Sequence, residues 1–160
     1  MLVRKNNSGF SLIETFFTLF ILGLLFSMVC YGFNRLIPGY RLEGAVQSLV
    51  SDFQLARMKA ISQNCYYRIQ IIPDQKKYFL ERESLKGVSR WPGTQEGVLR
   101  MFNNPGNPYY YPGVALESST HNPVFSPRGA VVGTTVVLSN SSGQKKITLS
   151  SQGRVKVQGG

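Results

Sequence analysis

The sequence has few of the residues on which catalysis and metal binding depend. It contains a single histidine, His121, and only 8 acidic residues among its 160. No carboxylate pair, metal-ligand spacing, phosphate-binding loop or nucleophile elbow is recognisable in it. We therefore expect a protein that is not an enzyme and that holds no metal and no cofactor, and we expect His121 to be an ordinary surface residue.

Cysteine is also scarce, and the two cysteines are far apart. Cys30 lies in an apolar run, and Cys65 follows the next helical stretch, 35 residues later. One continuous helix between them would separate them by about 50 Å, whereas a disulfide requires Cα atoms within roughly 7 Å. The sequence predicts no intrachain disulfide, even for a domain in an oxidising compartment.

The shortage of acids leaves the chain strongly basic, with 18 lysines and arginines and a net charge of +10. A basic surface favours anionic partners such as nucleic acid, anionic lipid or acidic proteins. It is equally compatible with a surface whose charge serves only solubility.

A secretory cleavage site is missing from its usual place behind an apolar run. Residues 10–33 form such a run, and Glu14 is its one ionisable side chain. As a helix these 24 residues would span about 36 Å, enough to cross a bilayer. Cleavage after the run would require small residues there, and residues 34–38 do not provide them. A carboxylate inside a membrane helix is costly, so Glu14 is a candidate functional residue.

The candidate processing site lies in front of the run instead. The first nine residues are polar, with two basic residues and no acid, and Gly9-Phe10-Ser-Leu-Ile-Glu14 follows. This arrangement resembles the leader of type IV prepilins and type II secretion pseudopilins. The resemblance implies cleavage after Gly9 and N-methylation of Phe10 by a prepilin peptidase. It also implies that Glu14 pairs with the N-terminal ammonium of Phe10 in an adjacent subunit. An opposite charge nearby offsets the cost of a carboxylate in a low dielectric, so the pair would favour the correct register between subunits.

The rest of the chain predicts an α+β domain. Pro38 and Gly39 are expected to interrupt and kink the helix. From Arg41 to about residue 64, apolar residues recur at spacings of three and four, which predicts an amphipathic helix with one face in the core. That face comprises Leu42, Ala45, Val46, Leu49, Val50, Phe53, Ala56, Ala60 and Ile61.

Strand-like alternation begins after Asn64. We predict strands at residues 66–72, 77–82, 98–102, 130–138, 145–150 and 154–157, with turns at 73–75 and 140–143. Residues 103–112 are proline-rich and predict a loop. Its tyrosines, Tyr109 to Tyr111, are expected to brace the loop against the domain, with stacking on bases or packing on a neighbouring subunit as alternatives.

These segments define the expected organisation. Residues 1–9 form a leader, 10–33 a transmembrane and filament-core helix, 34–64 an amphipathic helix, and 65–160 a periplasmic β-sheet domain. The fold is a long helix packed on an antiparallel sheet. The leader implies a single-pass protein of the bacterial inner membrane, with a cytoplasmic N-terminus, that later enters a filament.

Three segments resemble the GspH/FimT family of pilin-like proteins. The first is the helix end Leu55–Ile61, which contains Ala56-Arg57 and is followed by Asn64. The second is the segment Phe-Ser-Pro-Arg-Gly at 125–129. The third is the pair of closing strands, with Gly-Arg-Val-Lys at 153–156. The match is weakest over residues 84–122. The resemblance implies an H-type minor pseudopilin, which assembles with other pilin or pseudopilin subunits for protein secretion across the outer membrane and contacts secreted cargo. The alternative is a FimT-like minor pilin that binds DNA during uptake.

A basic C-terminal segment supplies candidate DNA-binding residues. Residues 118–160 contain five basic side chains and no acid: Arg128, Lys145, Lys146, Arg154 and Lys156. Alternation places Lys146 on the face of its strand opposite Ile147, and it places Arg154 and Lys156 together on one face of the next strand. A hairpin would gather these three cations into one patch for phosphates. DNA-binding members of the family usually have an arginine at the position of Lys156. Lysine keeps the positive charge but lacks the planar guanidinium with its paired hydrogen-bond donors. The alternative is a solvated edge that resists aggregation.

Overall fold

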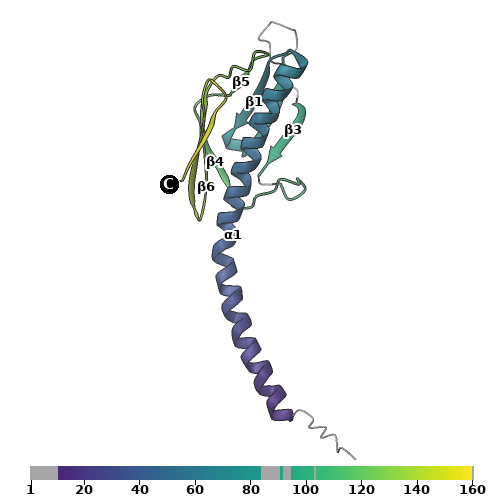
Figure 1. Cartoon of the computed structure of the whole chain (residues 1–160), viewed down its shortest axis with the longest axis vertical. Coiled ribbons are helices and arrows are strands. Elements are labelled where there is room, and N and C mark those ends of the chain that lie inside the picture. Colours follow the sequence, from purple (N-terminus) through teal and green to yellow (C-terminus); the bar gives the residue numbers. More distant parts are fainter. Residues whose placement is uncertain (1–10, 84–90, 92–94, 103, 160) are drawn as a thin grey trace, which may run out of the picture. The chain divides into compact units, whose positions relative to one another are not determined.

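The computed structural model describes residues 11–83, 91, 95–102 and 104–159 (Figure 1). It divides into two units, Met1–Leu36 and Ile37–Gly160, which are considered separately. Helix α1 (Leu12–Gln63) supplies the described residues of the first unit and begins the second.

The first unit exposes apolar side chains throughout. The large hydrophobic residues from Leu12 to Met28 are exposed, with Leu12 at 86% and Phe17 at 62%, and so is Phe33. Within the part of the chain that the structure describes, no helix combines the length and the apolarity needed to cross a membrane.

Helix α1 continues through Pro38, so the predicted interruption is wrong. The φ angle of proline suits a helix, and its missing N–H removes one hydrogen bond, which a long helix can tolerate. The Asn140 side-chain amide donates a hydrogen bond to the Pro38 carbonyl at 2.6 Å. The helix ends where Asn64 adopts φ 52°, a left-handed conformation that commonly follows a helix C-terminus.

The second unit begins with the amphipathic part of α1, and its apolar face is buried as predicted. The fully buried members are Leu42, Ala45, Val46, Leu49, Phe53, Ala56 and Ala60. Val50 is partly buried against this core, whereas Ile61 lies off it, since 51% of Ile61 is exposed. It lies about 100° round the helix from Ala60, which takes it off the buried face.

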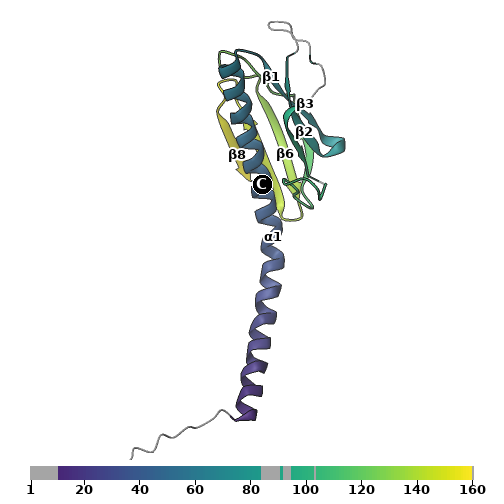
Figure 2. The same cartoon turned by 90° about the vertical axis from the view of Figure 1, so that its right-hand side faces the viewer.

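Two four-stranded antiparallel sheets complete this unit, where the sequence suggested one (Figures 1 and 2). The first has the order β3-β2-β1-β5 and the second the order β4-β6-β7-β8. The first sheet contains β1 (Tyr67–Ile72), β2 (Lys77–Arg82), β3 (Gln95–Met101) and β5 (Val124–Phe125), with the 3-10 turn η1 (Pro73–Gln75) between β1 and β2. The second contains β4 (Ala115–Ser119), β6 (Thr134–Asn140), β7 (Gly143–Leu149) and β8 (Val155–Gly159).

One core joins the helix and both sheets. It combines the apolar face of α1 with Tyr67, Ile69 and Tyr78 from the first sheet and Leu138 and Ile147 from the second. The fold is therefore α+β, as predicted, with a helix packed on antiparallel sheets.

Candidate functional site

The predicted processing residues Gly9 and Phe10 lie outside the described residues, so their role stays a prediction. Glu14 is described. It lies in the first turn of α1, its backbone N–H donates to the Ser11 carbonyl at 3.0 Å, and its side chain is exposed.

The apolar side chains around Glu14 form what we call the apolar helix surface. Its members are Leu12, Ile13, Phe16, Phe17, Leu19, Phe20, Ile21, Leu22, Leu24, Leu25, Phe26, Met28 and Phe33, each of them exposed. Consecutive residues point in different directions round a helix, so the apolar helix surface faces all sides. An exposed apolar area of this kind marks an interaction with a membrane or with other proteins.

The candidate DNA-binding residues divide into three places. In the β7–β8 hairpin, Lys146 pairs with Gln158, and Thr148 pairs with Lys156, which puts Lys146 and Lys156 on one exposed face. Arg154 immediately precedes β8 and is exposed. We call Lys146, Arg154 and Lys156 the hairpin patch.

Lys145 does not belong to the hairpin patch. Its neighbours in the alternation of β7 are the buried Ile147 and Leu149, and its Nζ lies 3.8 Å from Glu43 Oε2 on α1. Arg128 is exposed in the turn after β5, where the Gly129 N–H donates to the Ser126 carbonyl at 2.9 Å. The predicted set therefore shares a charge but does not form a single site.

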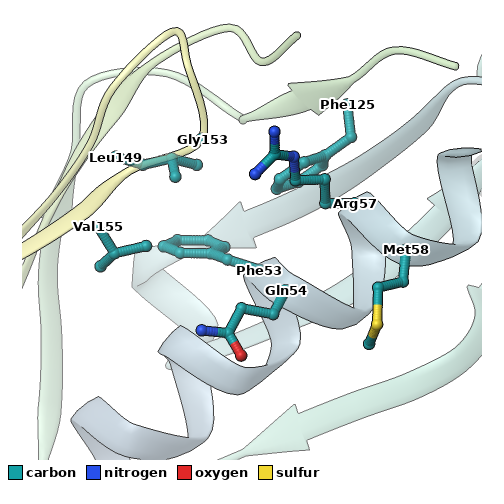
Figure 3. Close-up of a pocket in the computed structure, with 8 residues that line it drawn as sticks. All are labelled: Phe53, Gln54, Arg57, Met58, Phe125, Leu149, Gly153 and Val155. Atoms are coloured by element: carbon teal, nitrogen blue, oxygen red, sulfur yellow. The ribbon is translucent and has the colours of Figure 1, made fainter. Parts of the chain in front are cut away.

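The three segments that carry the family resemblance meet around Arg57 (Figure 3). Its Nε donates a hydrogen bond to the Gly129 carbonyl at 3.2 Å, across 72 residues of sequence. A Cβ built on Gly153 would lie 2.9 Å from Arg57 Nη1, so a larger residue there would displace the end of the Arg57 side chain. Both glycines have positive φ angles, 80° at Gly129 and 79° at Gly153, which glycine adopts without strain. The sequence analysis identified the segments but not this contact.

A cavity of about 350 Å³ opens beside Arg57. Its residues are Phe53, Gln54, Arg57, Met58, Phe125, Leu149, Gly153 and Val155. The rings of Phe53 and Phe125 lie at a tilt, with centroids 6.3 Å apart. Apolar residues thus form most of the lining, while Arg57 and Gln54 supply its polar groups. We call this space the Arg57 cavity.

A buried polar cluster joins α1 to the first sheet. Asp52 is 3% exposed and accepts hydrogen bonds of 2.8 Å from Arg100 Nε, from Arg100 Nη2 and from the Tyr78 hydroxyl. Burial, reinforced by the Asp52 charge, raises the pKa of Tyr78 well above its usual value. Burial opposes the charged form of Arg100, but the hydrogen bonds and charge of Asp52 outweigh it and raise its pKa. The cluster is a structural support with no reactive group exposed.

Two of the three loop tyrosines brace the loop, as predicted. The Arg100 guanidinium carbon lies 3.2 Å from the centroid of the Tyr109 ring. Tyr111 Oη and Ser48 Oγ lie 2.8 Å apart and share a hydrogen bond. Tyr110 is 39% exposed. His121 is exposed, and among the residues the structure describes no three potential metal ligands gather together.

A family model matches more than half of the chain. The family model described as type II transport protein GspH matches residues 45–153. A search of curated proteins finds no match.

Solved structures show the same fold at low sequence identity. The minor pseudopilin EpsH from the type II secretion system of Vibrio cholerae is similar, with 14% identity, a TM-score of 0.57, and coverage of 74% of this chain and 97% of EpsH. A second EpsH structure gives 13% identity and a TM-score of 0.54, over 73% of this chain and 92% of that chain. The type IV minor pilin FimU of Pseudomonas aeruginosa is similar at 15% identity and a TM-score of 0.51, over 73% of this chain and 87% of FimU.

Proposed function

The chain belongs to the GspH family of pilin-like proteins, and from this membership we propose that it is a minor pseudopilin of a type II secretion system. Proteins of this family are structural subunits that assemble with other pilins or pseudopilins. The proposed task is to take part in a periplasmic filament that drives protein secretion across the outer membrane. The description of the family as a type II transport protein favours the secretion filament over a type IV pilus.

The apolar helix surface is the main observation that supports the proposed role as a filament subunit. Leu12, Phe17 and Leu25 are 86%, 62% and 58% exposed, and a surface this apolar is unfavourable in water. We propose that residues 10–33 anchor the subunit in the inner membrane, with the N-terminus cytoplasmic and the domain periplasmic. The same side chains then pack against those of neighbouring subunits in the filament.

We propose that Glu14 sets the axial register between neighbouring subunits in that packing. A prepilin peptidase would cut after Gly9 and methylate Phe10, which leaves a charged amine at the new N-terminus. Glu14 of one subunit then pairs with Phe10 of the next, and a subunit in the wrong register leaves both charges unpaired among apolar side chains.

The variant Glu14→Leu tests this role, because it keeps the run apolar and removes the charge. We expect it to enter the membrane normally and to be depleted from sheared filaments. Thr18→Leu, a polar-to-apolar change one turn later in α1, is the matched control and should assemble like the wild type. Incorporation of Glu14→Leu at the control level would refute the assembly role.

The hairpin patch favours a second candidate, a minor pilin that binds DNA during uptake. Lys146 and Lys156 share an exposed face in the hairpin register, and the exposed Arg154 immediately precedes β8, so we propose that these cations contact one phosphate backbone. We expect Arg154→Gln/Lys156→Gln protein to lose retention on DNA in low salt. Lys145→Gln changes a cation that faces Glu43 and should retain DNA. Equal retention on DNA by the wild type, the Arg154→Gln/Lys156→Gln variant and the Lys145→Gln variant would reject the hairpin patch as a DNA-binding site.

Deletion of the gene separates the two candidates. Loss of exoprotein secretion with normal transformation supports the secretion filament, and loss of transformation with normal secretion supports the uptake pilus.

A further inference from the structure

The Arg57 cavity contains hydrogen-bond donors for which the described residues provide no acceptor. Arg57 donates through Nε to Gly129, and the described residues provide no acceptor for its Nη1 and Nη2 groups. These two nitrogens form the fork that binds both oxygens of a carboxylate. The Arg57 side chain is therefore an anchored cation with its bidentate edge still available.

The position of this fork is fixed by backbone rather than by flexible side chains. The Gly129 carbonyl holds one edge of the guanidinium, and Gly153 lies so close to it that a Cβ there would meet Arg57 Nη1 at 2.9 Å. An arginine held in this way loses little side-chain entropy when a ligand binds, which favours recognition. In Figure 3 the guanidinium extends toward Gly153, above the ring of Phe53.

The remaining lining of the Arg57 cavity suits an apolar group. Phe53 and Phe125 are 1% exposed, so their rings are fixed by the core, and Leu149 and Val155 complete the apolar wall. Met58 is 61% exposed, and a flexible thioether there can adapt to a ligand. No acidic side chain lines the cavity.

We propose that the Arg57 cavity is a docking site for a segment of another protein that carries a carboxylate beside an apolar side chain. The carboxylate pairs with Arg57, and the apolar side chain packs on Val155 and Met58, which are the apolar lining residues that remain accessible. The cavity adjoins β8, which is last in its sheet order, so the outer side of β8 offers backbone groups to an extended segment.

Charge also favours an acidic protein segment. Arg154 follows Gly153, Arg128 precedes Gly129, and both cations are exposed. Three acids of the domain, Asp52, Glu81 and Glu83, are buried and do not offset this charge. Cations around a docking site attract an acidic partner and speed its association. The apolar wall distinguishes this site from one that serves only the phosphates of nucleic acid.

The test uses the full chain in detergent micelles and two synthetic peptides, acetyl-Gly-Phe-Glu-Gly-amide and its Gln counterpart. Methyl NMR of the methionines reports binding, because Met58 lines the cavity while Met28 lies in the first unit and serves as an internal reference. We expect the Glu peptide to shift the Met58 signal, leave Met28 unchanged, and bind about tenfold more tightly than the Gln peptide.

Two exposed glutamines on α1 supply charge variants in which Arg57 itself is kept. Gln54→Glu places a negative charge at the cavity and should weaken the Glu peptide about threefold without affecting the Gln peptide. Gln47→Glu makes the same charge change about two turns away and should alter neither.

Four results would overturn the proposal. Equal affinity for the two peptides, or an unchanged affinity in Gln54→Glu, would remove Arg57 as the carboxylate anchor. Binding of 3-phenylpropionate without binding of the Glu peptide would make this a small-molecule pocket. Displacement of the Glu peptide by a short DNA strand would assign the surface to nucleic acid. None of these measurements requires a filament, so they are independent of the assembly experiment with Glu14→Leu.

Discussion

Replacing Arg100 with methionine would leave a charge buried without its main partner. Asp52 is 3% exposed, and Arg100 supplies two of its three side-chain hydrogen bonds. Methionine preserves much of the length of the side chain and provides no donor. Asp52 would then keep only the Tyr78 hydroxyl, and water has little access to take over the lost bonds.

The expected cost is large relative to the stability of one domain. Removing one partner of a buried ion pair destabilises a protein by about 3–5 kcal/mol, out of a total of about 5–15 kcal/mol. For a domain of this size the melting temperature should fall by about 10–20 °C. The double variant Asp52→Asn/Arg100→Met removes the charge as well, and it should recover at least about 1 kcal/mol of that loss.

Urea unfolding of the full chain in a mild detergent, followed by near-ultraviolet circular dichroism, measures both changes. Arg41→Met is the matched control, because Arg41 is exposed and its one hydrogen bond among the described residues is a long one, 3.5 Å to the Pro112 carbonyl. It should change stability by less than about 0.5 kcal/mol. The reasoning fails if Arg100→Met behaves like Arg41→Met, or if the double variant is less stable than Arg100→Met.

Three further substitutions address neighbouring features. Because burial raises the pKa of Tyr78 above its unfolded value near 10, stability should be intact below about pH 10 and fall as the pH rises beyond it. Urea midpoints between pH 8 and 11 should therefore fall less steeply in Tyr78→Phe, and parallel curves would contradict this. Glu83→Gln should raise the melting temperature, because Glu83 Oε2 is buried without a hydrogen-bond partner among the described residues. Replacing the carboxylate with a neutral amide is expected to stabilise the domain by about 1 kcal/mol. A lower melting temperature would contradict this prediction. Gly153→Ala should cost more than Gly113→Ala, since both have positive φ but only a Cβ at Gly153 meets Arg57. Equal losses in thermal unfolding would show that the Arg57 contact contributes nothing.

Periodicity predicted the elements whose two faces differ most. Leu42 to Ala60 on α1 follow a helical repeat and are buried, and β2 begins and ends at Lys77 and Arg82, as the alternation indicated. Strand β4 was not predicted, because Ala-Leu-Glu-Ser-Ser contains too little apolar alternation to be distinguished from a loop. Alternation also does not determine which strands pair, so one sheet was expected where two exist.

The sites depended on contacts that local patterns do not contain. Alternation placed Lys146 on the exposed face, but the ion pair between Lys145 and Glu43 arises from packing of the hairpin on α1. The sequence marks Arg57 only by its place in the segment Leu55–Ile61. Its role required knowing that Gly129 and Gly153, which are 72 and 96 residues away in sequence, would meet its guanidinium.

Those long sequence separations have a consequence for folding order. The Arg57 cavity needs α1, β5 and the β7–β8 hairpin together, so it forms only after loops of many tens of residues have closed. Contacts of this kind form late in folding, after local helix and hairpin structure. A chain that stops at an intermediate can contain a helix and hairpins and still lack the cavity. A partner that binds there would therefore recognise only subunits whose folding is complete.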